Sequence, residues 1–122
     1  MSPGGEPGPA SSPTLPGIDL DKVVHERSRL RILTYLASSE TGEIGFTELR
    51  DALGFTAGNL SVQLKTLEEA GYLEIEKRFV ANKSYTGAKL TKSGQDALAA
   101  YFGEMEALIA SLKEGVMGTK GG

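Results

Sequence analysis

Residues 18–39 are the first segment of the chain in which apolar residues recur at helical spacing. Leu30 and Leu33 lie three residues apart, and their apolar neighbours continue the same face of a helix. A polar break near residues 25–26 divides the segment. Glu26 or Ser28 is placed to bond the free amides of the following first turn. The pattern therefore predicts a helix that begins after this break.

Two shorter helices are predicted next, each bounded by a cap and a glycine. Thr47 precedes an apolar pair and is the expected N-cap of the first, and Gly54 is the expected left-handed end of that helix. Thr56 is the expected cap of the second helix, which ends at Gly71. The buried stripe of this second helix has spacings of four and three: Leu60, Leu64 and Leu67.

Residues 72–90 change from helical spacing to the alternation of a strand. Leu73, Ile75 and Phe79 are apolar, with charged residues between them. The polar run 81–84 predicts a turn, and residues 85–90 predict a return strand. Ile44 is a candidate for a short third strand that pairs with this hairpin.

A long final helix is predicted from Lys92, capped by Thr91, to about Gly115. Its apolar positions follow the 3.5-residue repeat of a helix that lies along another helix. We expect this stripe to form a homodimer, although the plain core of a single domain is the alternative. The stripe is Leu98, Phe102, Met105, Ile109, Leu112 and Val116.

Composition sets the domain boundaries and excludes several classes of site. All five prolines fall within residues 1–17, which we interpret as a disordered arm. Residues 18–117 form one domain, and residues 118–122 are expected to fray. The chain has no cysteine, which excludes disulfides and thiolate chemistry and fits a cytoplasmic protein. No apolar run is long enough for a membrane helix, and the N-terminus does not resemble a signal peptide.

The distribution of charge matters more than its total. The net charge is −3, yet the segment 77–92 has five basic residues and no acid. Because salt screens charges beyond about 8–10 Å, a local basic surface can bind phosphates on an acidic protein. The segment's basic residues are Lys77, Arg78, Lys83, Lys89 and Lys92.

The ordered set of motifs resembles the MarR/ArsR-like winged helix-turn-helix transcriptional regulators, in their compact branch with a dimerising terminal helix. The resemblance covers residues 19 to about 112. It rests on runs that begin at His25 (HERSRLRIL), Phe46 (FTEL), Asn59 (NLS), Leu67 (LEEAG) and Leu90 (LTKSG). It implies a mainly α fold with a small β-hairpin wing. It also implies a homodimer, in which helix 56–70 enters the major groove and the wing 72–90 contacts the minor groove or backbone.

We therefore expect a sequence-specific DNA-binding regulator, a repressor, that reads a pseudo-palindromic operator. Small polar and basic side chains on the recognition helix suit base edges and phosphates, although an ordinary solvated helix face has the same composition. For the basic residues of the hairpin, the alternative to DNA contact is a charged strand edge that prevents aggregation. The candidate DNA contacts are Thr56, Gly58, Asn59, Ser61, Val62, Lys65, Arg78, Lys83, Lys89 and Arg29, the last with an intramolecular ion pair as its alternative.

Other functions are less well supported by the residues. No nucleophile–base pair, phosphate loop or metal-ligand spacing is visible, so we expect neither an enzyme nor a cofactor. His25, the single histidine, is expected to be structural rather than a sensor. Metal sensing, known in relatives, would need clusters that this chain lacks, and the wing tip 82–84 lacks the arginine common in relatives. The rival hypothesis is a winged-helix module that binds an acidic protein. A small apolar effector bound between the dimerising helices would extend the hypothesis of a DNA-binding regulator, but no polar group there identifies the ligand.

Overall fold

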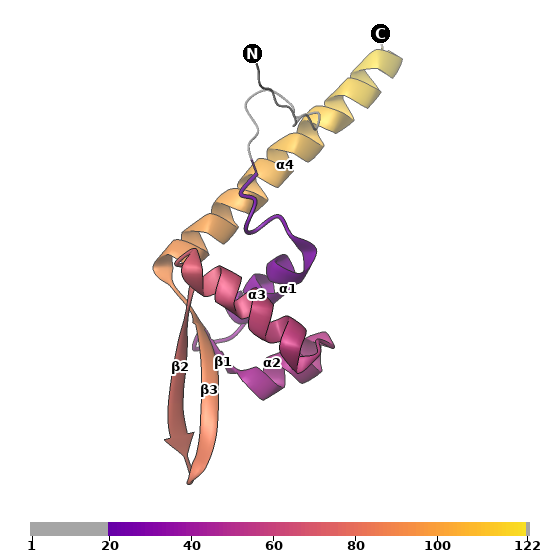
Figure 1. Cartoon of the computed structure of the whole chain (residues 1–122). Coiled ribbons are helices and arrows are strands. Elements are labelled where there is room, and N and C mark those ends of the chain that lie inside the picture. The colour runs from indigo at the N-terminus through magenta and orange to yellow at the C-terminus, as the bar shows by residue number, and fades with distance from the viewer. Residues whose placement is uncertain (1–19, 122) are drawn as a thin grey trace, which may run out of the picture. The chain divides into compact units, whose positions relative to one another are not determined.

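The computed structural model describes residues 20–121, with side chains up to residue 116. The predicted arm, residues 1–17, lies outside the described residues. Residues 21–102 form one compact unit, and a second unit includes α4 from Gly103 onward. In chain order the elements are α1 (Arg27–Ala37), β1 (Glu43–Gly45), α2 (Phe46–Leu53), α3 (Ala57–Glu69), β2 (Leu73–Val80), β3 (Lys83–Leu90) and α4 (Lys92–Gly121) (Figure 1).

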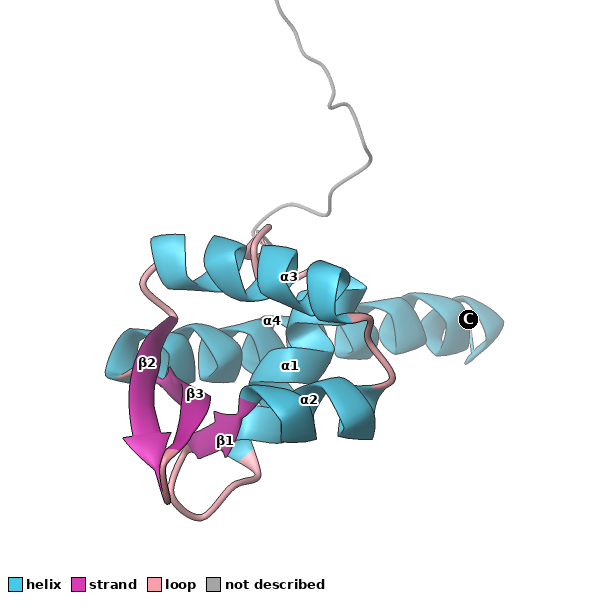
Figure 2. Ribbon diagram, turned by 60° about the horizontal axis from the view of Figure 1, so that its bottom comes forward, coloured by secondary structure: helices cyan, strands magenta, loops and turns pink. Residues whose placement is uncertain are grey.

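The expected fold class is confirmed. The strands form an antiparallel sheet in the order β1-β3-β2, so the β2–β3 hairpin is joined to the helices through the short β1. The predicted pairing of Ile44 is also confirmed, because it lies opposite Ala88 of β3. The helices α1, α2 and α3 pack beside the sheet, and the hairpin extends beyond β1 (Figure 2). This arrangement is a winged helix-turn-helix with a mainly α composition.

One apolar core holds the residue 21–102 unit together. Its most completely buried side chains come from α1, the turn before it, α2, α3 and β2, and the predicted stripe of α3 belongs to it. Fully burying such a side chain stabilises a protein by roughly 1.5–3 kcal/mol. The fully buried large side chains are Val24, Ile32, Leu33, Leu36, Leu49, Leu60, Leu67 and Leu73.

The predicted break before α1 is confirmed. Glu26 is the N-cap, and its carboxylate accepts a hydrogen bond from the Arg29 amide at 3.0 Å. Upstream, Asp21 accepts hydrogen bonds from the amides of Val23 (2.8 Å) and Val24 (3.1 Å), which holds a turn rather than a helix. The start of this segment as predicted, residues 18–19, lies outside the described residues.

The capping of the two short helices is partly as predicted. Thr56 caps α3, and Gly54 ends α2 with a positive φ of 74°, as glycine readily allows. The prediction for Thr47 is wrong, because the N-cap of α2 is Gly45 and no side chain caps the helix. The reason is that β1 runs directly into α2, so the helix begins at Phe46 and Thr47 already lies inside its first turn.

The turn of the hairpin is tighter than the predicted 81–84. It consists of Ala81 and Asn82, both with positive φ (53° and 66°), as in the type I′ turns that match the twist of paired strands. Lys83 and Ser84 therefore belong to β3 and pair with Val80 and Phe79. The sequence did not indicate this, because Ala81 is an unusual residue for a left-handed position.

The final helix is longer than predicted. Thr91 caps it, accepting a hydrogen bond from the Gly94 amide at 3.0 Å, but α4 continues to Gly121 rather than ending near Gly115. A glycine ends a helix when it adopts a left-handed conformation. Among the described residues, the glycines with positive φ are Gly42, Gly54 and Gly71, so those within α4 do not act in this way. No helix in the described part of the chain is long and apolar enough to cross a membrane.

Candidate nucleic-acid interface

The exposed face of α3 carries small polar side chains at its N-terminal end. Thr56 accepts a hydrogen bond from the Asn59 amide at 3.1 Å, which fixes the first turn. Asn59 and Ser61 are exposed. Val62 is also exposed, with 61% of its surface accessible, which is a high value for a large apolar residue of this protein. The structure thus brings together on one helix face the predicted contacts Thr56, Gly58, Asn59, Ser61, Val62 and Lys65.

The opposite side of α3 is anchored by apolar and polar contacts. Leu60, Leu64 and Leu67 are buried in the core. Arg29 reaches across from α1 and donates from Nη1 to Gln63 Oε1 at 3.0 Å. Gln63 in turn donates from Nε2 to Asn59 Oδ1 at 3.4 Å. A chain of hydrogen bonds therefore connects α1 to an exposed side chain of α3.

Arg29, one of the predicted DNA contacts, is engaged by groups of the protein itself. Its side chain is only 18% exposed, and its Nε donates to the Val23 carbonyl at 2.7 Å. With Gln63 and, at 4.0 Å, Glu26 as its other partners, the guanidinium is held inside the protein. The intramolecular ion pair that was the alternative for Arg29 is present, with Glu26 as its partner.

The hairpin has two faces with different surroundings. Ile75, Lys77 and Phe79 alternate onto one face, opposite Ala88, Thr86 and Ser84 of β3. This face borders α3, because a cleft of about 500 Å³ is lined from the helix by Ser61 and Lys65 and from the hairpin by Ile75, Lys77 and Thr86. Lys77, absent from the predicted contacts, therefore lies beside α3. Strand alternation with Ile75 was the signal that could have identified it.

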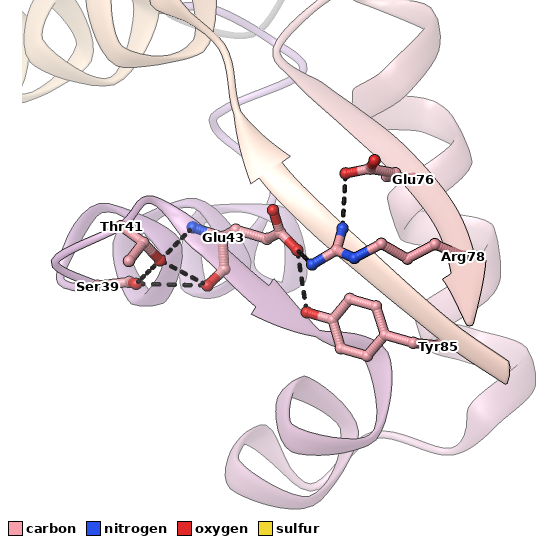
Figure 3. A network of polar contacts seen from close by, with 6 residues as sticks. All are labelled: Ser39, Thr41, Glu43, Glu76, Arg78 and Tyr85. Carbon is pink, nitrogen blue, oxygen red and sulfur yellow. Dashed lines mark hydrogen bonds and ion pairs between the residues drawn. The ribbon is translucent and has the colours of Figure 1, made fainter. Parts of the chain in front are cut away.

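The other face of the hairpin holds an ion-pair network centred on Arg78 (Figure 3). The Arg78 guanidinium bonds Glu43 Oε2 of β1 at 3.0 Å and Glu76 Oε1 at 2.7 Å. It also lies 4.6 Å from the ring centroid of Tyr85, whose hydroxyl donates to Glu43 Oε2 at 3.1 Å. Arg78, predicted as a DNA contact, is thus engaged within the protein. The sequence did not indicate the ion pair with Glu43, because Glu43 lies in a distant segment and the basic run itself has no acid.

Electrostatics within the network favour the charged forms of Glu43 and Arg78. The hydrogen bond from Tyr85 lowers the pKa of Glu43 below its usual value, and Arg78 lowers it further. Burial raises the pKa of Tyr85, as does its bond to Glu43. Gly87 makes room for the network, since a Cβ there would lie 2.7 Å from Glu43 Oε2 and 2.9 Å from the Tyr85 ring. The network therefore depends on a glycine in β3.

The lysines of the interface differ in their partners. Lys65 forms an exposed ion pair with Glu69 at 3.7 Å. Lys89 lies on the Arg78 face and pairs across the sheet with Glu43 and Glu74. Within the described residues, neither Lys77 nor Lys83 forms an ion pair, and both are exposed. Lys89 also forms no ion pair in this part of the chain, but its charge lies near Glu43, whereas Lys83 lies beside the turn.

The predicted dimerisation stripe on α4 is exposed along most of its length. Leu98 is the exception: it is buried within its own unit and therefore belongs to the core. Met105 is partly exposed. The other members expose 43–68% of their surfaces: Phe102, Ile109, Leu112 and Val116.

Two tyrosines hold the segment before α1. Burial acts to raise the pKa of Asp21, but hydrogen bonds from the Tyr72 hydroxyl and two backbone amides outweigh it, so the pKa is lowered. His25 Nδ1 bonds the hydroxyl of the buried Tyr101 at 2.8 Å, which joins this segment to the start of α4. These contacts fit the structural role expected for His25.

Comparisons with known proteins agree with this geometry. A family model described as "Winged helix DNA-binding domain" matches residues 28–109. The uncharacterised protein MJ0432 of Methanocaldococcus jannaschii is 33% identical over 92 residues, covering 75% of this chain and 98% of that protein.

Solved structures share the fold at lower identity. A transcriptional regulator homologue from Pyrococcus horikoshii has a TM-score of 0.68 and 23% identity, covering 74% of this chain and 87% of that one. MepR of S. aureus, solved with DNA, has a TM-score of 0.62 and 17% identity, covering 81% and 79%. At these identities the likeness shows the fold.

Proposed function

Because the chain belongs to the winged helix DNA-binding family, we propose that it is a homodimeric transcriptional regulator that reads a pseudo-palindromic operator through α3 and the hairpin. The observation that carries the proposal is the division of α3 into two sides. One side is buried and tied to α1, and the other offers exposed Asn59, Ser61 and Val62. Such side chains can bond base edges and contact a thymine methyl in the major groove.

The wing supplies the contacts that carry no sequence information. Lys77 and Lys83 are exposed and without ion pairs in the described residues, so they are suited to phosphates. Arg78 and Arg29 are left out of the proposed interface, because the exposed Arg78 guanidinium is bonded to two carboxylates and that of Arg29 is largely enclosed. The resulting interface has bases read by α3 and phosphates held by the two hairpin lysines.

The test of base reading compares specific with random DNA. Asn59→Ala and Ser61→Ala should reduce the preference for the operator by roughly 1–3 kcal/mol where a good contact is lost. Ser93→Ala, an equal truncation at an exposed position of α4, is the matched control and should bind as the wild type does. The operator is found by footprinting DNA upstream of the protein's own gene, with a mutated half-site as a comparison. An equal loss on specific and random DNA would assign the two residues to phosphates.

The same footprinted DNA tests the proposed repression. Purified protein added to a transcription assay from that promoter should lower the amount of transcript, because a protein bound over the promoter excludes polymerase. An increase in transcript would make the protein an activator. If neither operator nor random duplex is bound at about 50 mM salt, where phosphate contacts are strong, the protein-binding module becomes the better hypothesis.

A homodimer is proposed from the exposed stripe of α4. Phe102 and Ile109 expose 43% and 46% of their surfaces, and burying them against a second copy would remove this apolar area from water. Ile109→Glu should give a folded monomer in sedimentation, since it places a charge in the buried seam. Ala107→Glu is the control, because it adds the same charge at an exposed position on the other side of the helix. A wild-type protein that sediments as a monomer at tens of micromolar (roughly the concentration at which a modest interface should hold) would refute the dimer.

A further inference from the structure

Phe79 is the most exposed large apolar side chain in the described part of the chain, with 77% of its surface accessible. A single exposed apolar residue is common on protein surfaces and does not by itself indicate a partner. The position of this one is more informative. It lies near the end of β2, where it pairs with Ser84, two residues before the Ala81–Asn82 turn.

The alternation of β2 places Phe79 on the hairpin face that borders α3. It shares this face with Ile75 and Lys77, which line the cleft with Ser61 of the recognition helix. Val80 is also exposed but alternates onto the opposite face, where Arg78 is bound by Glu43. A long ligand that contacts Ser61 and Lys77 can therefore continue along the same hairpin face and reach the Phe79 ring.

The charges around Phe79 define the chemistry of that ligand. Lys77 precedes it on the same face and forms no ion pair within the described residues, whereas Lys83 pairs with Val80 and therefore lies on the opposite face. The neighbouring Glu76 is on the other face, where Arg78 pairs with it at 2.7 Å. An apolar ring beside a free ammonium group complements a molecule in which an anion adjoins an apolar surface. A DNA strand has this pattern, because phosphates alternate with the deoxyribose and base surfaces.

We propose that Phe79 contacts deoxyribose and base surfaces of bound DNA, beside a phosphate held by Lys77. The inference rests on the proposed DNA-binding function and adds an apolar contact to it. Aromatic side chains contribute to nucleic-acid binding by stacking on bases, and apolar side chains by entering the minor groove. Such a contact releases no counterions, so it should strengthen binding without changing the dependence on salt.

The test is a salt titration of DNA affinity for four proteins: wild type, Phe79→Ala, Val80→Ala and Lys83→Ala. Phe79→Ala should weaken binding by roughly tenfold per protomer, as expected for loss of a partly buried aromatic contact, with an unchanged slope of log K against log salt. Lys83→Ala should instead reduce that slope by about one per protomer. Val80→Ala, on the opposite face, should leave both affinity and slope unchanged. The circular dichroism of Phe79→Ala should match wild type, because the ring is exposed.

A covalent readout locates the contact directly. With p-benzoylphenylalanine incorporated at position 79, ultraviolet light should crosslink the protein to the duplex more strongly than with the same residue at position 80. Phe79→Ala that binds as tightly as wild type would overturn the proposed contact alone. Equal losses for Phe79→Ala and Val80→Ala would also overturn it, as would a Phe79→Ala effect confined to self-association. A wild-type protein that binds no duplex would overturn the proposed function together with this contact, so the two failures are distinguishable.

Discussion

Replacing Glu43 with glutamine should strengthen DNA binding while it destabilises the protein. In the structure, the Glu43 carboxylate accepts hydrogen bonds from Arg78 at 3.0 Å and from Tyr85 at 3.1 Å, and its side chain is 19% exposed. Glutamine has nearly the same shape but no charge. The substitution therefore weakens the hold on Arg78 and removes one negative charge from the wing.

The loss of stability follows from the hydrogen bond of Tyr85. A hydrogen bond to a charged acceptor contributes about 1.5–3 kcal/mol and one to a neutral acceptor about 0.5–1.5 kcal/mol, so Glu43→Gln should lose about 1 kcal/mol. In a domain of this size that corresponds to a Tm lower by roughly 4–8 °C. Differential scanning calorimetry measures this change.

The pH dependence of that loss has a definite sign. Since the pKa of Glu43 is lower in the folded protein, chiefly through the Tyr85 hydrogen bond, its contribution to stability is present above the ordinary glutamate pKa. It disappears as the pH falls through the lowered folded-state pKa. The difference in stability between wild type and Glu43→Gln should therefore be full at neutral pH and should shrink below about pH 4.

The gain in DNA affinity follows from Arg78. With one of its two carboxylate partners neutralised, the guanidinium should reach a phosphate, and each new phosphate contact steepens the slope of log K against log salt by about 0.9. A symmetric dimer should show about twice that change. Salt titrations on a random duplex, by fluorescence anisotropy, measure the slope for wild type and Glu43→Gln.

Glu40→Gln is the matched control for this experiment. It makes the same change in net charge at an exposed position in the loop before β1. If both variants raise affinity equally, net charge alone explains the effect. Weaker binding by Glu43→Gln would refute the reasoning, because it would mean that the network positions the wing for DNA.

Three further substitutions test the local structure by thermal or urea unfolding. Thr56→Ala removes the cap of α3 and its bond to the Asn59 amide, so it should cost about 1 kcal/mol, and a neutral result would exclude that cap. Ala81→Gly should stabilise by about 1 kcal/mol, because Ala81 has a φ of 53° that glycine adopts without strain; no gain would argue against the type I′ turn. Gly94→Ala would place a Cβ against the Tyr72 carbonyl and should cost about 3 kcal/mol or more, and a stable variant would contradict this packing.

The helical part of the fold was predictable because its signals are local. Spacings of three and four residues placed the buried stripe of α3, and Thr56 and Gly54 marked helix ends through bonds and conformations that involve only neighbouring residues. The pairing of Ile44 with β3 was also predictable from its order before a hairpin. The same reasoning failed at Thr47 and at the turn, because strand registers placed Gly45 and Lys83 where local propensity did not.

The sequence by itself determined which residue types were available for DNA, and only the tertiary structure decided which of them are free. Arg78, Lys83 and Lys77 look alike in a basic segment without acids. Their difference arises because β1 brings Glu43 onto one face of the hairpin and α3 borders the other. An ion pair depends on the distance between two charges in space, and residues 35 positions apart in the chain come within 3.0 Å only when the sheet forms.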